Sequence, residues 1–192
     1  MQGEFDKKCP PYPFDDKILF INNEISRDVK FPCKTIRVDD YIIPVLDFFG
    51  LNADSFTKNG NSGFWYSIAE LTAIYMAKDF DYLCWVQSDC RTKGDWITPG
   101  LKELDKKDIS VVSPVSAVNT WHKRDGLDQF FSDQAYLIKV SEFRKKIYDY
   151  KEPYQPEYPF YGGASFEYKV GQYLKNNNKY RRILDKFWCE HG

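Results

Sequence analysis

The chain has 192 residues and a formal net charge of −1, a length that suits one domain and a charge that gives no overall attraction to nucleic acid. Its five cysteines are odd in number and lack Cys-x-x-Cys spacing, which argues against a disulfide framework and a structural zinc site. The sequence shows neither a signal peptide nor a long apolar run, so we expect a soluble, cytoplasmic protein without a transmembrane segment.

Residues 1–16 are polar and interrupted by three prolines, which predicts an irregular N-terminal arm before a single domain over residues 17–192. The short apolar runs 17–22 (KILFIN) and 34–40 (KTIRVDD) are typical of buried strands, and the second run ends in two carboxylates. The apolar stretch 41–49 predicts a short helix, because a glycine follows it directly.

Residues 58–63 (KNGNSG) are rich in asparagine and glycine and predict a loop. Ser67 and Glu70 follow with the spacing of a capping box, which predicts that a helix begins at this point. Apolar residues at helical spacing continue to Met76, so we expect this helix to lead directly into the next strand.

The central stretch of the chain is 80–97 (FDYLCWVQSDCRTKGDWI), in which an apolar strand over 82–86 stops abruptly at polar residues. Asp89 lies just beyond the end of this strand. In α/β sheets, ligands bind in the crevice outside the C-terminal ends of the strands. A strand that delivers a carboxylate there is therefore suited to a metal or phosphate site.

The rest of the chain continues to alternate between strand and helix patterns. The predicted elements are a helix over 100–107 opened by Thr98-Pro99, a strand over 109–112, a long loop over 116–128, a strand over 135–140, a helix from Ser141 to Tyr150, a helix over 166–175 and a strand over 180–188. This alternation indicates an α/β domain with a mostly parallel sheet flanked by helices.

Three residues are candidates for chemistry, and each has a plainer interpretation. Asp89 could supply a rigid oxygen ligand to Mg²⁺ or Mn²⁺, or it could only cap a turn. His191 could complete a metal site, or it could be a terminal residue without a role. Glu167 lies in the first turn of a predicted helix, whose dipole favours the ionised form that a general base needs; such acids are also common without catalysis.

Four further candidates lie earlier in the chain. Asp39 and Asp40 could hydrogen-bond a nucleotide base or ribose at the end of their strand, although aspartate also favours turns. Asn61 and Gly63 could let the backbone approach a ligand, or they could only form the predicted loop.

From about residue 34 onward, these motifs resemble in order and spacing the glycosyltransferases of the GT-A fold, nearest to the family-2 enzymes. In that family a strand ending in Val-Asp-Asp contacts the nucleotide, and Val38-Asp39-Asp40 stands in that place. A loop of the form Asn-x-Gly leads into the helix before the metal-binding strand, as Asn61-Ser62-Gly63 does here. The family's Asp-x-Asp motif falls on Gln87-Ser88-Asp89, with Asp89 at its last, metal-binding position.

Three later segments extend the resemblance. Residues 130–147, which include Asp133, resemble the strand and helix that line the acceptor side. Residues 162–174 (GGASFEYKVGQYL) are similar to the family's GGEDxELxxRL segment. His191 resembles the late histidine that completes the metal site in many enzymes of this fold.

The resemblance implies a single Rossmann-like GT-A domain that transfers a sugar from a nucleotide-sugar donor to a hydroxyl acceptor. A UDP-sugar is the favoured donor, and the acceptor is a glycan or a modified nucleic-acid base. The implied cofactor is Mn²⁺ or Mg²⁺, held by Asp89 and His191. Glu167 is the implied base, with Asp133 as the second candidate. The implied donor-binding residues are Asp39, Asp40, Asn61, Gly63, Ser88 and Asp89.

The sequence departs from the family pattern at two motifs and leaves other functions open. Gln87 replaces the first aspartate of Asp-x-Asp, and Ala164 and Ser165 replace the expected Glu-Asp pair. These losses keep a non-catalytic nucleotide-sugar or sugar-binding module as the alternative. A nucleotidyltransferase would need a glycine-rich or basic signature near the first strand, and this chain lacks one. Nucleic-acid binding would depend on the basic C-terminal stretch alone. The motifs typical of P-loop kinases, GxSxG hydrolases and GxGxxG dehydrogenases are absent.

Overall fold

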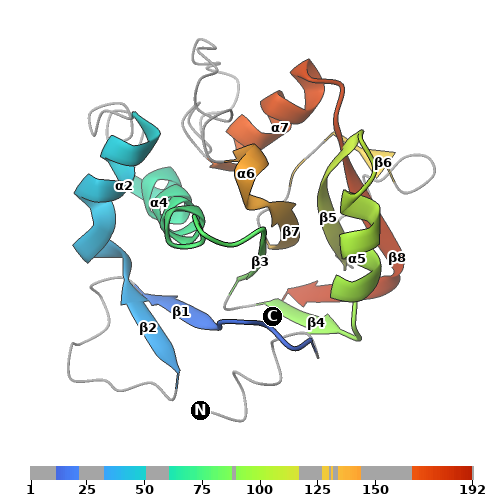
Figure 1. Ribbon diagram of the computed structural model, residues 1–192, viewed down its shortest axis with the longest axis horizontal. Coiled ribbons are helices and arrows are strands. Elements are labelled where there is room, and N and C mark those ends of the chain that lie inside the picture. Colours follow the sequence, from blue (N-terminus) through green and yellow to red (C-terminus); the bar gives the residue numbers. More distant parts are fainter. Residues whose placement is uncertain are drawn as a thin grey trace.

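The computed structural model describes the part of the chain that forms the core. The described residues are 12–21, 33–50, 61–87, 90–116, 127–129, 131, 134–143 and 166–191, a few of them by their backbone alone. In chain order the elements are β1 (Ile18–Ile21), β2 (Lys34–Arg37), the 3-10 helix η1 (Val38–Tyr41), α2 (Ile42–Phe49), α4 (Asn61–Met76), β3 (Tyr82–Val86), β4 (Cys90–Lys93), α5 (Ile97–Leu104), β5 (Ile109–Ser116), β6 (Leu127–Asp128), β7 (Ala135–Lys139), α6 (Val140–Phe143), α7 (Phe166–Asn176) and β8 (Tyr180–His191) (Figure 1).

The main sheet has the strand order β3-β7-β5-β8-β4, and β6 pairs with the start of β8. β7 runs antiparallel to both β3 and β5, whereas β5 and β8 run parallel, and β4 runs antiparallel to β8. The α/β class is confirmed, but the expectation of a mostly parallel sheet is wrong, since one of the five described pairings in this sheet is parallel. Apolar runs reveal that a strand is buried but not which way it runs, and β7 returns between two strands of the opposite direction.

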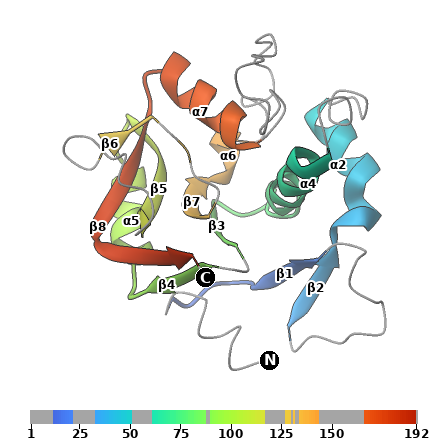
Figure 2. The ribbon, with the colours of Figure 1, turned by 180° about the vertical axis from the view of Figure 1, so that it is seen from behind.

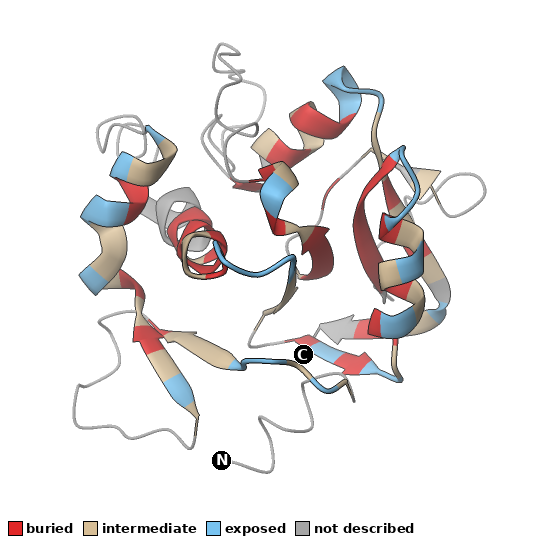
Figure 3. Ribbon diagram, in the orientation of Figure 1, coloured by how far each residue is buried: buried red, intermediate tan, exposed pale blue. Residues whose placement is uncertain are grey.

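Helices cover both faces of the main sheet. On one face, α4 and α7 share a core with Val111, Tyr136 and Ile138. On the other face, α5 packs against Val112 and Leu137. Successive residues of a strand point to opposite faces, so adjacent positions on β5 and β7 serve the two cores in turn. Figure 3 shows this burial along α4 and the central strands.

A second sheet, made of β1 and β2 in parallel, lies beside the β3 edge of the main sheet. The ring of Phe20 on β1 lies 5.8 Å from the ring of Trp85 on β3, measured between centroids. α4 contacts both β1 and β3 and therefore joins the two sheets. Figures 1 and 2 both place β1 and β2 on the side of the molecule away from α7.

The predicted strand over 34–40 ends earlier than expected. β2 stops at Arg37, and the following Val38–Tyr41 forms a turn of 3-10 helix. Asp39 and Asp40 therefore lie in the first turn of η1 rather than on a strand end. Aspartate is unfavourable in strands and favourable at the start of helices, which explains the change of conformation.

The predicted loop over 58–63 is wrong at its described end, because α4 begins at Asn61 and includes Gly63. The predicted capping box is also wrong. Ser67 and Glu70 lie inside α4 and are buried, with 1% and 2% of their surfaces exposed. A short capping signal is outweighed here, because tertiary packing supplies most of the stability of a helix.

α5 begins at Ile97, three residues before the predicted start, and Trp96 rather than Thr98 occupies its N-cap position, while the side chain of Asp95, one residue earlier, accepts hydrogen bonds from the start of the helix. The Asp95 carboxylate accepts hydrogen bonds from the backbone N–H groups of Ile97 and Thr98, both at 3.1 Å. It also accepts one from the Thr98 hydroxyl at 2.6 Å. These bonds satisfy amides that have no partner within the helix.

The remaining predicted helices and strands agree with the structure where it describes them. α2 ends before Gly50, which has a φ of 64°, as the glycine signal indicates. α7 and β7 match their predicted ranges to within a residue, while β5 and β8 extend further, β8 to His191. The predicted loop over 116–128 is wrong at its two described ends, because Ser116 belongs to the strand β5 and Leu127–Asp128 forms the strand β6. The predicted helix to Tyr150 is described only as far as Phe143.

The described part of the predicted N-terminal arm has no regular structure, but it is not detached. Tyr12 and Phe14 pack against the core beneath α5, with their ring centroids 5.1 Å apart. None of the helices in the described ranges is both long and apolar enough to cross a membrane.

Gly94, at the end of β4, should tolerate alanine less well than Gly50 does. Both have positive φ, 80° and 64°, so both variants carry backbone strain of about 1–2 kcal/mol. A Cβ at Gly94 would also lie 3.1 Å from the Phe187 ring, whereas a Cβ at Gly50 would meet no atom within 4 Å. We expect Gly94→Ala to lower the free energy of unfolding by roughly 1–2 kcal/mol more than Gly50→Ala in urea denaturation. Equal losses would contradict the packing of β4 against Phe187.

Candidate functional site

Three strands of the main sheet end at the same edge, which we call the carboxyl edge. β3 and β5 run in the same direction because both are antiparallel to β7, and β8 is parallel to β5. The carboxyl edge therefore holds the last residues of these strands, Val86, Ser116 and His191. In α/β proteins, this is where ligands bind.

The pairing of β4 with β8 brings two candidate segments together at the carboxyl edge. β4 begins at Cys90, directly after Asp89 in the sequence, and Cys90 lies opposite His191 in the register. The side chains of Cys90 and Cys189 are buried in a small cluster with Ala135, against which Val86 packs. The end of β3, the start of β4 and the end of β8 are thus joined, although the order of strands separates β3 from β8.

Backbone hydrogen bonds hold the start of β7 at the same place. The N–H of Gln87 donates to the carbonyl of Gln134 at 2.8 Å, and the N–H of Cys90 donates to the carbonyl of Gln87 at 3.1 Å. Gln134 follows Asp133 in the sequence, so the residue directly after Asp133 lies next to the end of β3. The Gln134 side-chain oxygen is buried and accepts no hydrogen bond from the described residues.

A cluster of aromatic rings lies beneath these segments and connects them to α7. The ring of Tyr136 lies 6.4 Å from that of Trp85, 5.0 Å from that of Phe131 and 6.1 Å from that of Phe166, measured between centroids. Phe131 and Phe166 also meet edge to face at 5.6 Å. We call these four residues the aromatic cluster. It fixes the start of α7, where Glu167 is the second residue, relative to the ends of β3 and β7.

Four of the six predicted donor-binding residues lie on η1 and at the start of α4. Asp39 and Asp40 lie on η1, which contacts α4, and α4 begins at Asn61. One carboxylate oxygen of Asp39, Oδ2, is buried and accepts no hydrogen bond from the described residues. A buried acceptor without a donor is costly, so a ligand that offers an N–H or O–H would be stabilised there.

The structure describes the predicted site residues to different extents. Ser88, Asp89 and Asp133 lie outside the described residues, and Asn61, Glu167 and His191 are described by their backbone alone. Among the side chains that are described, no three histidines, cysteines or acids lie close enough to hold a metal ion. The structure thus assembles the sequence neighbours of Asp89, Asp133 and Glu167, together with the backbone of His191.

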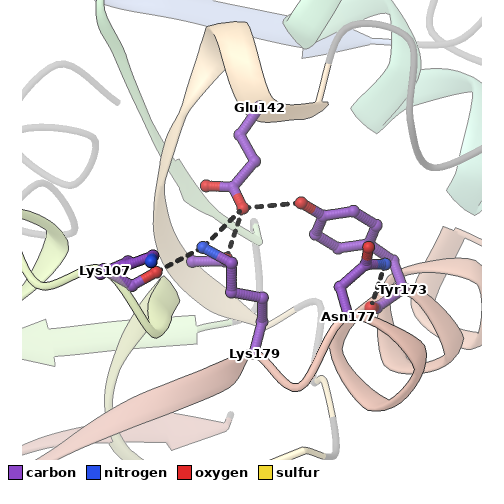
Figure 4. A network of polar contacts seen from close by, with 6 residues as sticks. Lys107, Glu142, Tyr173, Asn177 and Lys179 are labelled. Carbon is purple, nitrogen blue, oxygen red and sulfur yellow. Dashed lines mark hydrogen bonds and ion pairs between the residues drawn. The ribbon is translucent and has the colours of Figure 1, made fainter.

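A polar group around Glu142 lies at the opposite edge of the sheet, and its members bind one another (Figure 4). The Glu142 carboxylate oxygen Oε1 accepts hydrogen bonds from the hydroxyls of Ser110, at 2.6 Å, and Tyr173, at 2.7 Å. Lys179 pairs with the same oxygen at 3.7 Å and donates to the carbonyl of Lys107. These contacts tie β5, α6 and α7 together, which indicates a structural role.

Ser67 makes a contact other than the predicted capping box. Its hydroxyl oxygen accepts a hydrogen bond from the backbone N–H of Phe166, at 2.8 Å. The two residues are 99 positions apart, and no local sequence pattern connects them. The nearest sequence signal is the presence of Ser67, Glu70 and Thr72 among the apolar residues of 67–76. The structure shows that all three polar residues are buried.

No family model matches this chain, and no curated protein sequence does. A functional assignment therefore depends on the arrangement of the carboxyl edge and on the sequence motifs.

Tyr173→Phe should weaken folding in a pH-dependent way. Burial raises the pKa of Tyr173 well above its usual value, and the hydrogen bond to Glu142 and the negative charge of Glu142 raise it further. The unfolded tyrosine ionises near pH 10, so the stabilisation is complete below that pH and declines above it. We expect a loss of about 2 kcal/mol at pH 7 in Tyr173→Phe, shrinking between about pH 10 and pH 11.

Tyr180→Phe is the matched control, because the Tyr180 hydroxyl donates to the exposed Asn178. Urea denaturation of both variants and the native chain at several pH values measures the effect. An equal loss in the two variants at pH 7, or a Tyr173→Phe difference that stays constant to pH 11, would contradict this account.

Proposed function

We propose that the protein is a metal-dependent glycosyltransferase that moves a sugar from a nucleotide-sugar donor to a hydroxyl acceptor. The observation that carries the proposal is the register of β4 and β8, in which Cys90 lies opposite His191. Asp89 precedes Cys90 directly in the sequence, so the proposed metal site would take a carboxylate from just before β4 and an imidazole from the end of β8. That pair of ligands suits Mn²⁺ or Mg²⁺ with positions left for phosphate oxygens.

The metal chemistry required is simple and local. Asp89 and His191 would hold the ion, and the bound ion would offset negative charge on the departing nucleoside diphosphate. The GT-A resemblance assigns the same two positions to the metal site, and the pairing of β4 with β8 is consistent with that assignment.

The donor would lie between the carboxyl edge and the η1 region. Asp39 Oδ2, buried and without a described partner, offers an acceptor to a base N–H or a ribose hydroxyl. The start of α4, with Asn61 and Gly63, lies on the helix that contacts η1. A UDP-sugar is our first choice of donor, with a glycan or a modified nucleic-acid base as acceptor.

Glu167 is our proposed base, with Asp133 as the second candidate. The base takes the proton of the acceptor hydroxyl while the acceptor oxygen bonds to the anomeric carbon of the sugar. The bond between that carbon and the diphosphate oxygen breaks in the same step, and the nucleoside diphosphate leaves with the bonding electrons. The position of Glu167 in the first turn of α7 supports this role, because the helix dipole favours a carboxylate there.

The function can be tested with a panel of UDP-, GDP- and CMP-sugars, with and without Mn²⁺, using thermal shift and donor hydrolysis as readouts. We expect Mn²⁺-dependent binding of at least one donor, and Asp89→Asn should abolish it. Asp79→Asn is the control, because Asp79 is an exposed acid just before the opposite end of β3. Binding of no donor, or equal binding with and without Mn²⁺, would contradict the proposal.

Glu167→Gln separates catalysis from binding. We expect unchanged donor affinity and a turnover reduced roughly 100- to 10,000-fold, because the variant loses its general base. Full turnover in Glu167→Gln would remove this residue as the base and leave Asp133→Asn as the next variant to examine. Metal-dependent binding without any turnover in the native chain would instead identify a non-catalytic nucleotide-sugar-binding module.

A further inference from the structure

α7 begins with a backbone amide that is held from another helix. The first N–H groups of a helix have no partner within it, and a side chain just before the helix usually accepts from one of them. Here the acceptor of the Phe166 N–H is Ser67 Oγ on α4, at 2.8 Å. Both residues are buried, each with 1% of its surface exposed, so water does not replace this bond.

The side chain of Phe166 is held as firmly as its amide. Its ring contacts Phe131 and Tyr136 in the aromatic cluster, next to the segment that begins at the carboxyl edge. Phe166 is therefore fixed from two directions, by α4 through its backbone and by β7 through its ring. Glu167 is the next residue, so its Cα is placed by these two contacts.

α4 also connects this anchor to the proposed donor region. The helix begins at Asn61, contacts η1 with its two aspartates, and reaches Ser67 about two turns later. α4 and α7 also pack together in the shared core, and the buried hydrogen bond from the Phe166 N–H to Ser67 adds a directed polar contact between them.

We propose that Ser67 is a positioning residue, which fixes the first turn of α7 and thereby the backbone of Glu167, the proposed base. The inference rests on the proposed function for the role of Glu167. Ser67 itself touches neither donor nor acceptor in this proposal, so its loss should affect the chemical step and leave donor binding unchanged.

Two variants on α4 test the inference. Ser67→Ala removes the hydroxyl that holds Phe166. Thr72→Val removes a second buried hydroxyl of the same helix, but Thr72 donates within α4, to the carbonyl of Ile68 at 2.6 Å. A general weakening of α4 would appear in both variants, whereas a loss of the anchor would appear in Ser67→Ala alone.

Hydrogen exchange is the readout that does not depend on activity. We expect amide exchange over residues 166–170 to be at least about 10-fold faster in Ser67→Ala than in the native chain, and unchanged in Thr72→Val. In the presence of donor, acceptor and Mn²⁺, Ser67→Ala should lower kcat about 10- to 100-fold while the KM for the donor stays the same.

Unchanged exchange over residues 166–170 in Ser67→Ala would overturn the anchor. Faster exchange with an unchanged kcat, or with a raised donor KM and an unaltered kcat, would overturn the positioning role. If the native chain binds no donor with Mn²⁺, the proposed function fails, and with it the role of Ser67 toward Glu167. The exchange experiment would still report separately on the contact between α4 and α7.

Discussion

The structure depends above all on the way β8 pairs along its length. It runs parallel to β5 from Tyr180 to Cys189. Its start also pairs antiparallel with β6, and its last residues pair antiparallel with β4. The register between β5 and β8 shifts after Pro114, which has no N–H to donate to a neighbouring strand. Beyond that shift β8 continues between β5 and β4, so Cys90 comes to lie opposite His191. This pairing places the backbone of His191 opposite Cys90, the residue that follows Asp89 in the sequence.

α4 and the aromatic cluster carry this arrangement to the other candidate segments. The helix is buried along most of its described length and touches η1, β1, β3 and α7. The cluster joins Trp85 near the end of β3 to Phe166 at the start of α7. The polar group around Glu142 fastens α7 at its other end, far from the carboxyl edge. A rigid scaffold of this kind is what a site needs if its carboxylates are to act together.

The sequence predicted the local elements better than their arrangement. The sequence predicted the strand at 82–86, the end of α2 before a glycine and the start of α7 at Phe166, because neighbouring residues encode each of them. The sequence did not predict the mixed direction of the sheet, β4 or the hydrogen bond of Ser67 to Phe166, because each depends on partners far away in the chain. Ser67 shows this most clearly. The sequence contains the capping pattern, but the Ser67 hydroxyl accepts a hydrogen bond from Phe166, 99 residues away, at the start of another helix.

The most direct test of the central claim uses Mn²⁺ as a paramagnetic probe in the presence of UDP. NMR spectra of the isotope-labelled chain should show strong broadening of the Cys90 and His191 amide signals, because the broadening falls off steeply with distance from the Mn²⁺ ion. The Gly50 amide, at the end of α2, should be affected much less, and Asp89→Asn should remove the selective broadening. Uniform broadening, or an undiminished effect in Asp89→Asn, would contradict a metal site formed where β4 meets β8.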